Sequence, residues 1–354
     1  MPFIHSVACQ MAPHYYEQET LTRTLLEDWS GDYVNTDRIL QFQQNVQVGG
    51  RHLAVPLERY RKLKTFGDFN DAWLEAAVPM ATKAVDELLD GAGLSPEQVG
   101  SITSTTVTGL AVPSLDARLM NQLDFPRSTR RTPLFGLGCL AGVAGINRVG
   151  DYLVGHPTEA AILVAVELCS LTLQKQDLSV ANLIASGLFG DGCAAVLMVG
   201  DEHPLAATAP LEWSNPRSAF FNDTERVMGW DVVDSGFKVV LSPEVPRLVA
   251  NEVPKEVEAL LEEADVDRDK PDFLVAHPGG PRVLEALEGA LDLEPDMLRF
   301  SWDSLQKHGN MSSASVLFIL KETLDNLPPA GSVGMMTALG PGFCAEFNLL
   351  RRAS

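Results

Sequence analysis

Short runs of apolar residues alternate along the chain with longer segments in which apolar residues recur at helical spacing. The runs at 101–109, 159–168 and 193–200 are rich in apolar or β-branched residues, which predicts buried strands. Residues 71–93 have apolar side chains at helical intervals and end at a glycine, which predicts a helix. This alternation indicates an α/β fold.

The second half of the chain shows the same alternation of strand and helix patterns. Its pattern predicts a helix at 253–266, a strand at 272–280, helices at 281–291 and 311–327, and a pair of strands within 332–350. Because the order of elements is similar in both halves, we expect a pseudo-duplicated layer fold. The two halves are predicted at 1–205 and 206–354, with no repeat at the level of individual residues.

The composition indicates a globular protein without a membrane span. The chain has 354 residues, of which 45% are hydrophobic and 21% charged, enough for a sizeable core. No apolar run reaches the roughly 18 to 20 residues that cross a bilayer. The first residues lack the basic and apolar regions of a secretion signal, so we expect a cytoplasmic protein. The net charge of −20 disfavours nucleic acid and anionic membranes as partners.

One basic segment, residues 51–64, contrasts with this acidic background. It contains Arg51, Arg59, Arg61, Lys62 and Lys64. Two interpretations stay open: a local patch for an anionic substrate, or an ordinary solvated helix face.

The cysteine pattern predicts reduced thiols. The five cysteines are Cys9, Cys139, Cys169, Cys193 and Cys344. None is paired as Cys-x-x-Cys, so no zinc ribbon, thioredoxin-type motif or other metal site is expected. An odd count without a secretion signal argues against a disulfide framework. Free cysteines are usually buried structural residues, and the question is whether Cys139 is another of these.

Cys139 lies within "PLFGLGCLAGVAGINRVG", residues 133–150. The pattern predicts a strand that enters a tight turn, followed by a helix from about residue 140. The sulfur would then lie near a helix N-terminus, where unpaired N–H groups and the helix dipole stabilise a thiolate. This arrangement resembles a nucleophile elbow. A buried structural cysteine beside glycines is the alternative.

His277 and Asn310 are the other candidates for chemistry. His277 follows an apolar strand, at the end where functional groups gather in α/β sheets, although a turn histidine is the plain alternative. Asn310 precedes a helix rich in small polar residues, where an asparagine can also be a simple cap.

Taken together, Cys139, His277 and Asn310 can support acyl transfer. The cysteine can form a thioester with an acyl group, and the histidine can hold its thiolate as an ion pair. The histidine and asparagine can then both donate hydrogen bonds to a thioester oxygen as an enolate develops. Decarboxylative carbon–carbon bond formation requires this arrangement. Cysteine proteases use the same residue types, but nothing in the sequence indicates a peptide cleft.

Five motifs occur in a specific order: "FGLGCLAGVAG", "GLFGDGCAAVL", "VAHPGGPRVLEAL", "HGNMSSASVLFIL" and "LGPGF". Together they resemble a type III polyketide synthase of the chalcone synthase-like branch of the thiolase superfamily. The resemblance covers nearly the whole chain, most firmly from about residue 100 to 347. It implies a homodimer of thiolase-like subunits, each with five α-β-α-β-α layers.

The resemblance also implies roles for single residues. Cys139 matches the nucleophile that carries the primer and the growing chain, His277 the residue that activates it, and Asn310 the residue that stabilises the enolate. The substrates would be an acyl-CoA starter and malonyl-CoA, with no metal or redox cofactor. Arg51 is expected to help bind the CoA phosphates, and Gly279 and Gly280 to lie beside CoA.

Positions in the expected substrate cavity differ from the plant pattern. Phe189 matches one of two aromatic gatekeepers, whereas Val239 occupies the position of the other. Cys169, Val107 and Thr108 stand where plant enzymes carry threonine or serine.

Two further positions complete the expected cavity. Val112 matches the residue that reaches across the dimer into the partner's cavity. Trp230 is expected to shape the cavity floor and to limit the number of extensions.

At these cavity positions the chain resembles the bacterial enzymes that make alkylpyrones and alkylresorcinols. We therefore expect a medium or long fatty acyl starter, two or three condensations, and closure to an α-pyrone or a resorcinol. Tetrahydroxynaphthalene is a less expected product, since makers of that compound have a cysteine where this chain has Val107. Two alternatives stay open: an enzyme like ketoacyl synthase III that performs one condensation onto an acyl carrier protein, and a non-catalytic acyl-binding protein.

Overall fold

Nine strands form one continuous sheet in the computed structural model, which describes residues 1–29, 35–266, 270–294 and 296–352. Their order is β11-β12-β13-β8-β1-β7-β6-β4-β5. The bounds are β1 Phe3–Met11, β4 Val99–Thr105, β5 Arg130–Leu134, β6 Ala160–Leu168, β7 Asp191–Val199, β8 Leu211–Phe220, β11 Phe273–Ala276, β12 Val333–Gly340 and β13 Cys344–Arg352. Strands β1 and β8 pair over Phe3–Glu212 and Ile4–Leu211, so the sheet divides there into five-stranded and four-stranded parts.

The two parts of the sheet have similar topology. Parallel pairs lie at the outer edges, β4 with β5 and β6 in one part and β11 with β12 in the other. Antiparallel pairs lie toward the junction, β6–β7–β1 in one part and β12–β13–β8 in the other. The chain passes from one part to the other between β7 and β8, the connection that contains the predicted boundary at residue 205.

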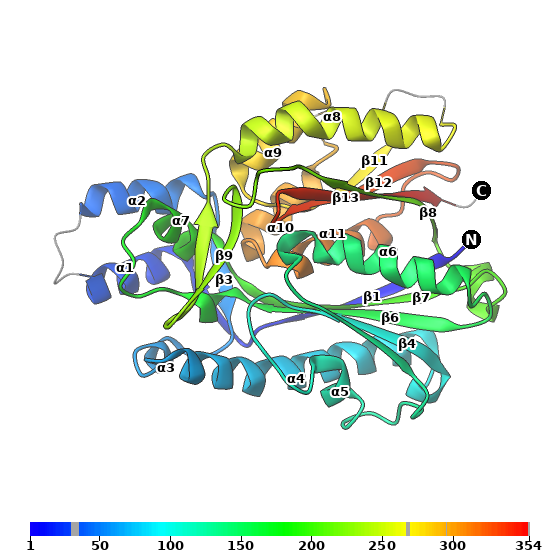
Figure 1. Cartoon of the computed structure of the whole chain (residues 1–354), viewed down its shortest axis with the longest axis horizontal. Coiled ribbons are helices and arrows are strands. Elements are labelled where there is room, and N and C mark those ends of the chain that lie inside the picture. Colours follow the sequence, from blue (N-terminus) through cyan, green and yellow to red (C-terminus); the bar gives the residue numbers. More distant parts are fainter. Residues whose placement is uncertain (30–34, 267–269, 295, 353–354) are drawn as a thin grey trace.

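Helices cover and separate the two parts of the sheet. The helices are α1 Gln18–Trp29, α2 Thr36–Asn45, α3 Leu57–Tyr60, α4 Phe66–Ala92, α5 Leu115–Leu119, α6 Ala141–Val154, α7 Val180–Leu188, α8 Val245–Glu263, α9 Pro281–Ala290, α10 Arg299–His308 and α11 Ser315–Asp325. Figure 1 shows α4 against the five-stranded part, α6 and α11 between the two parts, and α8 with α9 against the four-stranded part. The predicted α-β-α-β-α thiolase-like layering is therefore confirmed.

The central layer is the most deeply buried part of the protein. Ten of the 14 residues of α6 are buried, and five of them (Val143, Ala144, Ile146, Val149 and Leu153) share one apolar cluster with α11 and with strands of both sheet parts. A side chain at Gly142 would overlap the Ser313 carbonyl and Val316, so a glycine is needed where α6 approaches the start of α11. This close contact brings the residues before α6 and α11 together.

Most of the predicted elements are present, and α8 shows the largest difference in a boundary. The pattern predicts its start at residue 253, whereas the helix begins at Val245 and continues through Pro254. A proline inside a helix removes one backbone hydrogen bond. The buried face formed by Val249, Val253 and Val257 packs on the sheet and holds the helix together across this point.

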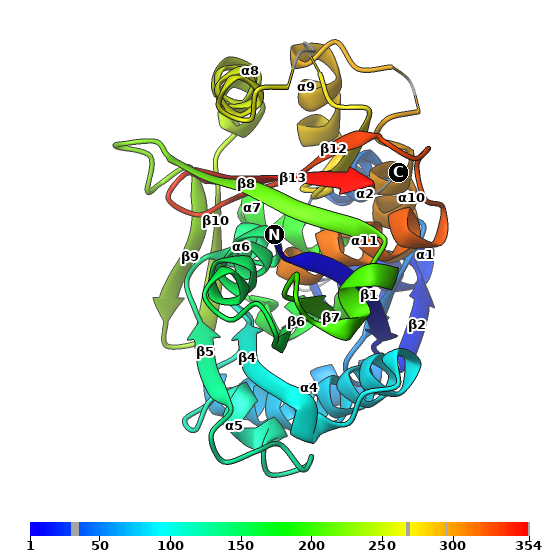
Figure 2. The same ribbon diagram turned by 90° about the vertical axis from the view of Figure 1, so that its right-hand side faces the viewer.

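Several elements lie outside the five layers and were not predicted. Strands β9 Met228–Val233 and β10 Gly236–Leu241 form a separate hairpin, and β2 His14–Glu17 pairs with β3 Gly50–Leu53. Figure 2 shows the hairpin standing beside the large sheet, and Figure 1 shows α1, α2 and α7 gathered at the same end of the protein. Within the described part of the chain, none of the helices is both long and apolar enough to pass through a bilayer.

Candidate active site

Cys139 lies at the start of the central layer. It belongs to the 3₁₀ turn Gly138–Leu140, which leads directly into α6. Gly138 has a φ of +55°, and a side chain there would lie 2.6 Å from the ring of Pro341, so the turn requires a glycine. The predicted position of Cys139 in a turn that leads into a helix is therefore confirmed.

His277 follows β11 directly and is 4% exposed. Its backbone N–H donates to the Thr337 carbonyl on the neighbouring strand β12, at 2.9 Å. Neither ring nitrogen has a hydrogen-bond partner among the described residues. The strand end therefore fixes the position of the imidazole and leaves both nitrogens available to a substrate.

Asn310 lies in the short connection between α10 and α11 and is 2% exposed. Its Nδ2 donates to the Gly279 carbonyl at 3.2 Å, and its Oδ1 accepts from the Ser312 N–H at 2.7 Å. Its own backbone pairs with the segment around Phe189. One connection thus links Asn310 to the turn after His277 and to the predicted gatekeeper.

The three candidates share one cavity, which we call the triad cavity. Its volume is about 50 Å³. Its walls comprise Gly138, Cys139, Leu188, Phe189, Met228, Gly229, Trp230, Val239, Val240, Leu241, Val245, His277, Gly279, Val283, Asn310, Ser312, Leu339 and Pro341. The structure therefore brings together the three residues that the sequence separates by 138 and 33 positions.

Burial favours the neutral forms of both titratable members. It raises the pKa of the Cys139 thiol to about 11; hydrogen bonds from Ser312 and Asn310 oppose this increase, and the charge of Glu167 adds to it. Burial also lowers the pKa of His277 to about 3. Burial thus opposes the thiolate–imidazolium ion pair expected from the sequence, and that ion pair stays a prediction.

Glu167 is a carboxylate without exposed surface, at the end of β6. It accepts hydrogen bonds from Ser313 Oγ at 2.6 Å, Thr108 Oγ1 at 2.9 Å and the Val107 N–H at 3.1 Å. Burial raises its pKa to about 7, although these hydrogen bonds oppose the increase. Glu167 thus links the segment after Asn310 to the loop that follows β4.

A second cavity adjoins the first, and we call it the leucine-lined cavity. Its volume is about 80 Å³, and it is partly open to solvent. Its walls comprise Leu21, Thr24, Leu25, Asp28, Arg51, Leu53, Leu57, Tyr60, Cys169, Ser170, Thr172, Leu173, Asn182, Ala185, Ser186, Phe189, Trp230 and Val239. Phe189, Trp230 and Val239 line both cavities and form the partition between them.

The partition is more aromatic than the sequence interpretation suggested. The rings of Phe189 and Trp230 have centroids 6.0 Å apart, and Trp230 pairs with Val239 across the hairpin. Trp230 therefore stands in the partition and not at a cavity floor. Its side chain compensates in part for the aromatic ring that Val239 lacks.

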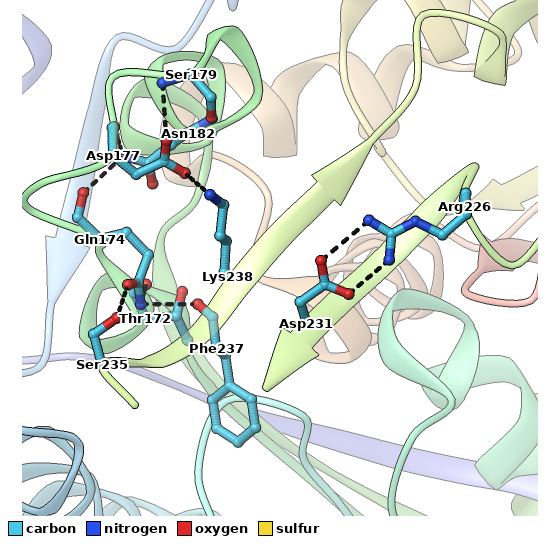
Figure 3. Close-up of polar contacts among 10 residues, drawn as sticks. All are labelled: Thr172, Gln174, Asp177, Ser179, Asn182, Arg226, Asp231, Ser235, Phe237 and Lys238. Atoms are coloured by element: carbon cyan, nitrogen blue, oxygen red, sulfur yellow. Dashed lines mark hydrogen bonds and ion pairs between the residues drawn. The ribbon is translucent and has the colours of Figure 1, made fainter. Parts of the chain in front are cut away.

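Polar contacts attach the hairpin to the loop that precedes α7 (Figure 3). Lys238 Nζ lies 3.3 Å from Asp177 Oδ2. Gln174 accepts from Ser235 Oγ at 2.6 Å, and its Nε2 donates to the Phe237 carbonyl at 3.1 Å. These contacts position the strand that carries Val239.

Arg51 is placed differently from the expectation. It is 4% exposed, lines the leucine-lined cavity, and donates to the Phe189 carbonyl at 2.7 Å and to Gln18 Oε1 at 3.2 Å. A guanidinium held in this way does not extend to the surface, where CoA phosphates would lie, so the structure argues against the predicted phosphate contact. Arg59 and Arg61 form exposed ion pairs with acidic side chains, as expected for a solvated face.

The remaining predicted residues fall into four places. Cys169 lines the leucine-lined cavity, whereas Val107 and Thr108 lie behind Glu167 and line neither of the two cavities. Val112 is 97% exposed. Gly279 lines the triad cavity.

Gly280 immediately precedes α9, and the contact of Gly279 and Gly280 with CoA stays a prediction.

Sequence reasoning missed two residues of this site, Glu167 and Ser312. A single acid near the end of the otherwise apolar run 160–168 was the available signal for Glu167. Ser312 lies inside a quoted motif, but nothing in the sequence distinguishes it from its serine neighbours.

Comparison with known families gives two matches along the chain. A family model described as "FAE1/Type III polyketide synthase-like protein" matches residues 35–211. One described as "Chalcone and stilbene synthases, C-terminal domain" matches residues 214–354. The two matches meet at the start of β8, directly after the connection between the two parts of the sheet.

Individual proteins are similar over almost the full length. The 1,3,6,8-tetrahydroxynaphthalene synthase of Streptomyces peucetius subsp. caesius is 40% identical over 98% of this chain and 92% of that protein. The alpha-pyrone synthesis polyketide synthase-like protein Pks18 of Mycobacterium tuberculosis is 28% identical over 89% and 83%. The crystal structure of 1,3,6,8-tetrahydroxynaphthalene synthase from Streptomyces coelicolor A3(2) superposes with a TM-score of 0.93, at 30% identity and 99% coverage of both chains.

Proposed function

Because this chain belongs to the type III polyketide synthases, the family of chalcone and stilbene synthases, we propose that it extends a medium or long fatty acyl-CoA starter with malonyl-CoA. The enzyme transfers acyl groups and condenses malonyl-CoA, and the starter and product are the proposed part. The observation that carries the proposal is the leucine-lined cavity, which adjoins the triad cavity through Phe189, Trp230 and Val239.

The first step of the proposed reaction loads Cys139. His277, neutral in the resting enzyme, takes the thiol proton as the sulfur attacks the starter thioester. The carbonyl carbon gains a bond to Cys139 and loses its bond to CoA, and the departing CoA thiolate takes the proton back from His277. The acyl group is then held as a thioester on Cys139.

The second step forms the carbon–carbon bond. His277 and Asn310 donate hydrogen bonds to the thioester oxygen of malonyl-CoA, which stabilises the enolate as carbon dioxide leaves. The enolate carbon attacks the acyl carbonyl on Cys139 and releases the cysteine thiolate. His277 and Asn310 are 4% and 2% exposed, so little water reaches the enolate to protonate it. Decarboxylation supplies the carbanion, so the reaction needs no metal or redox cofactor.

The starter would extend into the leucine-lined cavity. Leucines from α1, α3 and the segments around them provide an apolar wall. Each methylene buried there contributes about 0.8 kcal/mol, which is enough to discriminate starters by chain length. After two or three condensations, the chain would close to an alkyl-α-pyrone or an alkylresorcinol. The similarity to an alpha-pyrone synthesis protein supports this class of product.

A second candidate function is an aromatic product built from malonyl units alone. The 40% identity to a tetrahydroxynaphthalene synthase favours it. The aromatic partition also restricts the passage between the two cavities. A starter assay distinguishes the two functions, because the second one needs no fatty acyl-CoA.

The proposed enzyme acts as a homodimer. Val112 is 97% exposed and Phe135 is 54% exposed. Strand β5 lies at the edge of the sheet with its first four residues exposed, so its backbone is free to pair with a second copy. A second copy of this chain would cover these groups.

Product analysis by mass spectrometry tests the proposal. The purified enzyme would receive malonyl-CoA alone, or malonyl-CoA with acyl-CoA starters from acetyl to palmitoyl, with Cys139→Ala in parallel. We expect alkylpyrones or alkylresorcinols that peak at one chain length and disappear in the variant. A naphthalene product from malonyl-CoA alone, with no gain from fatty starters, would support the second candidate and refute the first.

A further inference from the structure

The hydroxyl of Ser312 faces the triad cavity without an assigned role. The residue is 2% exposed, and its Oγ has no hydrogen-bond partner among the described residues. It lines the same cavity as Cys139, His277 and Asn310. A buried hydroxyl without a partner costs free energy, so its presence requires an explanation.

The backbone holds this hydroxyl in a strained position. Ser312 has a φ of +48°, in the left-handed region that a serine rarely adopts. Its N–H donates to Asn310 Oδ1 at 2.7 Å, and Ser313 Oγ on the other side donates to Glu167 Oε1 at 2.6 Å. The neighbouring contacts therefore maintain a conformation that aims Ser312 into the cavity.

The surroundings of Cys139 otherwise disfavour its anionic form. Burial is the main cause, and the titratable neighbours Glu167 and Cys169 provide no positive charge. Burial also keeps His277 neutral. The Cys139 thiolate, released in every condensation, must therefore be stabilised by hydrogen-bond donors.

The two hydrogen-bonding side chains that line the cavity beside Cys139 are those of Ser312 and Asn310, and both lower the pKa of Cys139 against the larger effect of burial. Asn310 Nδ2 already donates to the Gly279 carbonyl. The proposed reaction also requires the Asn310 amide at the malonyl thioester oxygen. Ser312 has neither of these other tasks.

We propose that Ser312 is a positioning residue whose hydroxyl donates a hydrogen bond to the Cys139 sulfur and stabilises the thiolate each time condensation releases it. Its importance for turnover rests on the proposed function. Both residues line the same cavity in the free enzyme, so the proposed hydrogen bond can be tested without any substrate.

The test is the rate at which iodoacetamide alkylates Cys139 as a function of pH, with the modified peptide identified by mass spectrometry. Ser312→Ala removes the hydroxyl, and Ser312→Gly removes it while relieving the strained backbone. Ser304→Ala is the matched control, since Ser304 is also a buried serine without a partner but lines neither cavity. We expect both Ser312 variants to react about tenfold more slowly at pH 7, with the rate profile displaced to higher pH, and the control to match the wild type.

Two results would overturn the proposal. One is an unchanged profile in folded Ser312→Ala. The other is a slower reaction in Ser312→Ala with a normal reaction in Ser312→Gly, which would assign the effect to the backbone and not to the hydroxyl. Because no CoA substrate is present, a failure here is distinct from a failure of the proposed starter.

Discussion

The triad cavity and the leucine-lined cavity share a partition, but they are built in different ways. The groups around Cys139, His277 and Asn310 lie at strand ends and helix starts of the central layers, held by backbone hydrogen bonds. The leucine-lined cavity is assembled from α1, α3, the segment after β6 and a hairpin outside the large sheet. The reaction therefore depends on the core of the fold, whereas starter selection depends on elements that can vary without disturbing the core.

The polar contacts of the two regions differ in burial as well. Around the triad cavity, Glu167 has no exposed surface and is held by serine, threonine and backbone donors. Beside the leucine-lined cavity, the hairpin is attached through Lys238, whose side chain is 42% exposed. Substitutions on the two sides should therefore differ in size and in kind.

The largest expected effect is on the reaction itself. Cys139→Ala should reduce product formation at least about a thousandfold, because no other group takes over the acyl chain. Its free energy of unfolding should change little, since Cys139 borders a cavity. Product yield measures the loss of activity, and a urea unfolding curve measures the change in the free energy of unfolding.

Cys169→Ala is the matched cysteine on the other side of the partition. It should retain condensation and change only the distribution of starters. Equal losses of product formation in Cys139→Ala and Cys169→Ala would show that the two cavities do not have separate roles in condensation and starter selection.

The next effect concerns the pH dependence of stability. Burial raises the pKa of Glu167 from 4.5 to about 7, so the native state binds more protons than the unfolded chain between these values. Its contribution to stability is fully present below pH 4.5 and is lost as the pH rises to 7. Relative to Glu167→Gln, the wild type should lose up to about 3 kcal/mol over this range, measured by urea unfolding.

Asp177, beside the hairpin, should show the opposite sign. Burial raises its pKa, but hydrogen bonds from Ser179 and Lys238 outweigh this and lower it below the ordinary value. Its contribution to stability is present above the ordinary pKa and is lost as the pH falls. The difference in stability between the wild type and Asp177→Asn should therefore change with pH in the opposite direction to the difference between the wild type and Glu167→Gln. A change in the same direction would contradict the contrast between the two regions.

A smaller effect is expected at the partition. Trp230→Leu widens the passage between the cavities, so the preferred starter should become longer. Each further methylene accommodated should change relative kcat/KM about fourfold, as measured with pairs of competing acyl-CoA starters. Trp302→Leu, a partly buried tryptophan on α10, is the control and should leave the preference unchanged.

The smallest effect is expected at the exposed attachment of the hairpin. Lys238→Ala removes the ion pair with Asp177 and should lower the free energy of unfolding by less than about 1 kcal/mol, because Lys238 is largely solvated. Lys321→Ala, which removes an exposed pair with Asp325, provides the comparison. A loss from Lys238→Ala several times that from Lys321→Ala would indicate that the hairpin depends on this contact.

The sequence predicted one of these two regions much better than the other. Buried strands such as β6, β7 and β11 are continuous apolar runs, and His277 directly follows β11. The hairpin β9–β10 has no comparable signal, since its side chains are largely half-buried and its position depends on contacts distant in sequence.

Arg51 shows the same limit for charged residues. Five basic residues within 51–64 suggest a surface patch, yet Arg51 is buried against Phe189 and Gln18. Composition cannot distinguish a buried arginine from a solvated one, because burial depends on acceptors that come from other segments. Ser312 was missed for a related reason, since only the three-dimensional structure shows its backbone conformation and its unpaired hydroxyl.

The most direct test of the account is the covalent loading of Cys139 across a ladder of acyl-CoA starters. The enzyme would be mixed with each starter without malonyl-CoA, and the acylated peptide identified by mass spectrometry in the wild type and in Trp230→Leu. We expect acyl groups on the peptide that contains Cys139, most abundant at one medium or long chain length. In Trp230→Leu this preferred chain length should become longer. Loading on another cysteine, or loading that is independent of chain length in both proteins, would contradict the account.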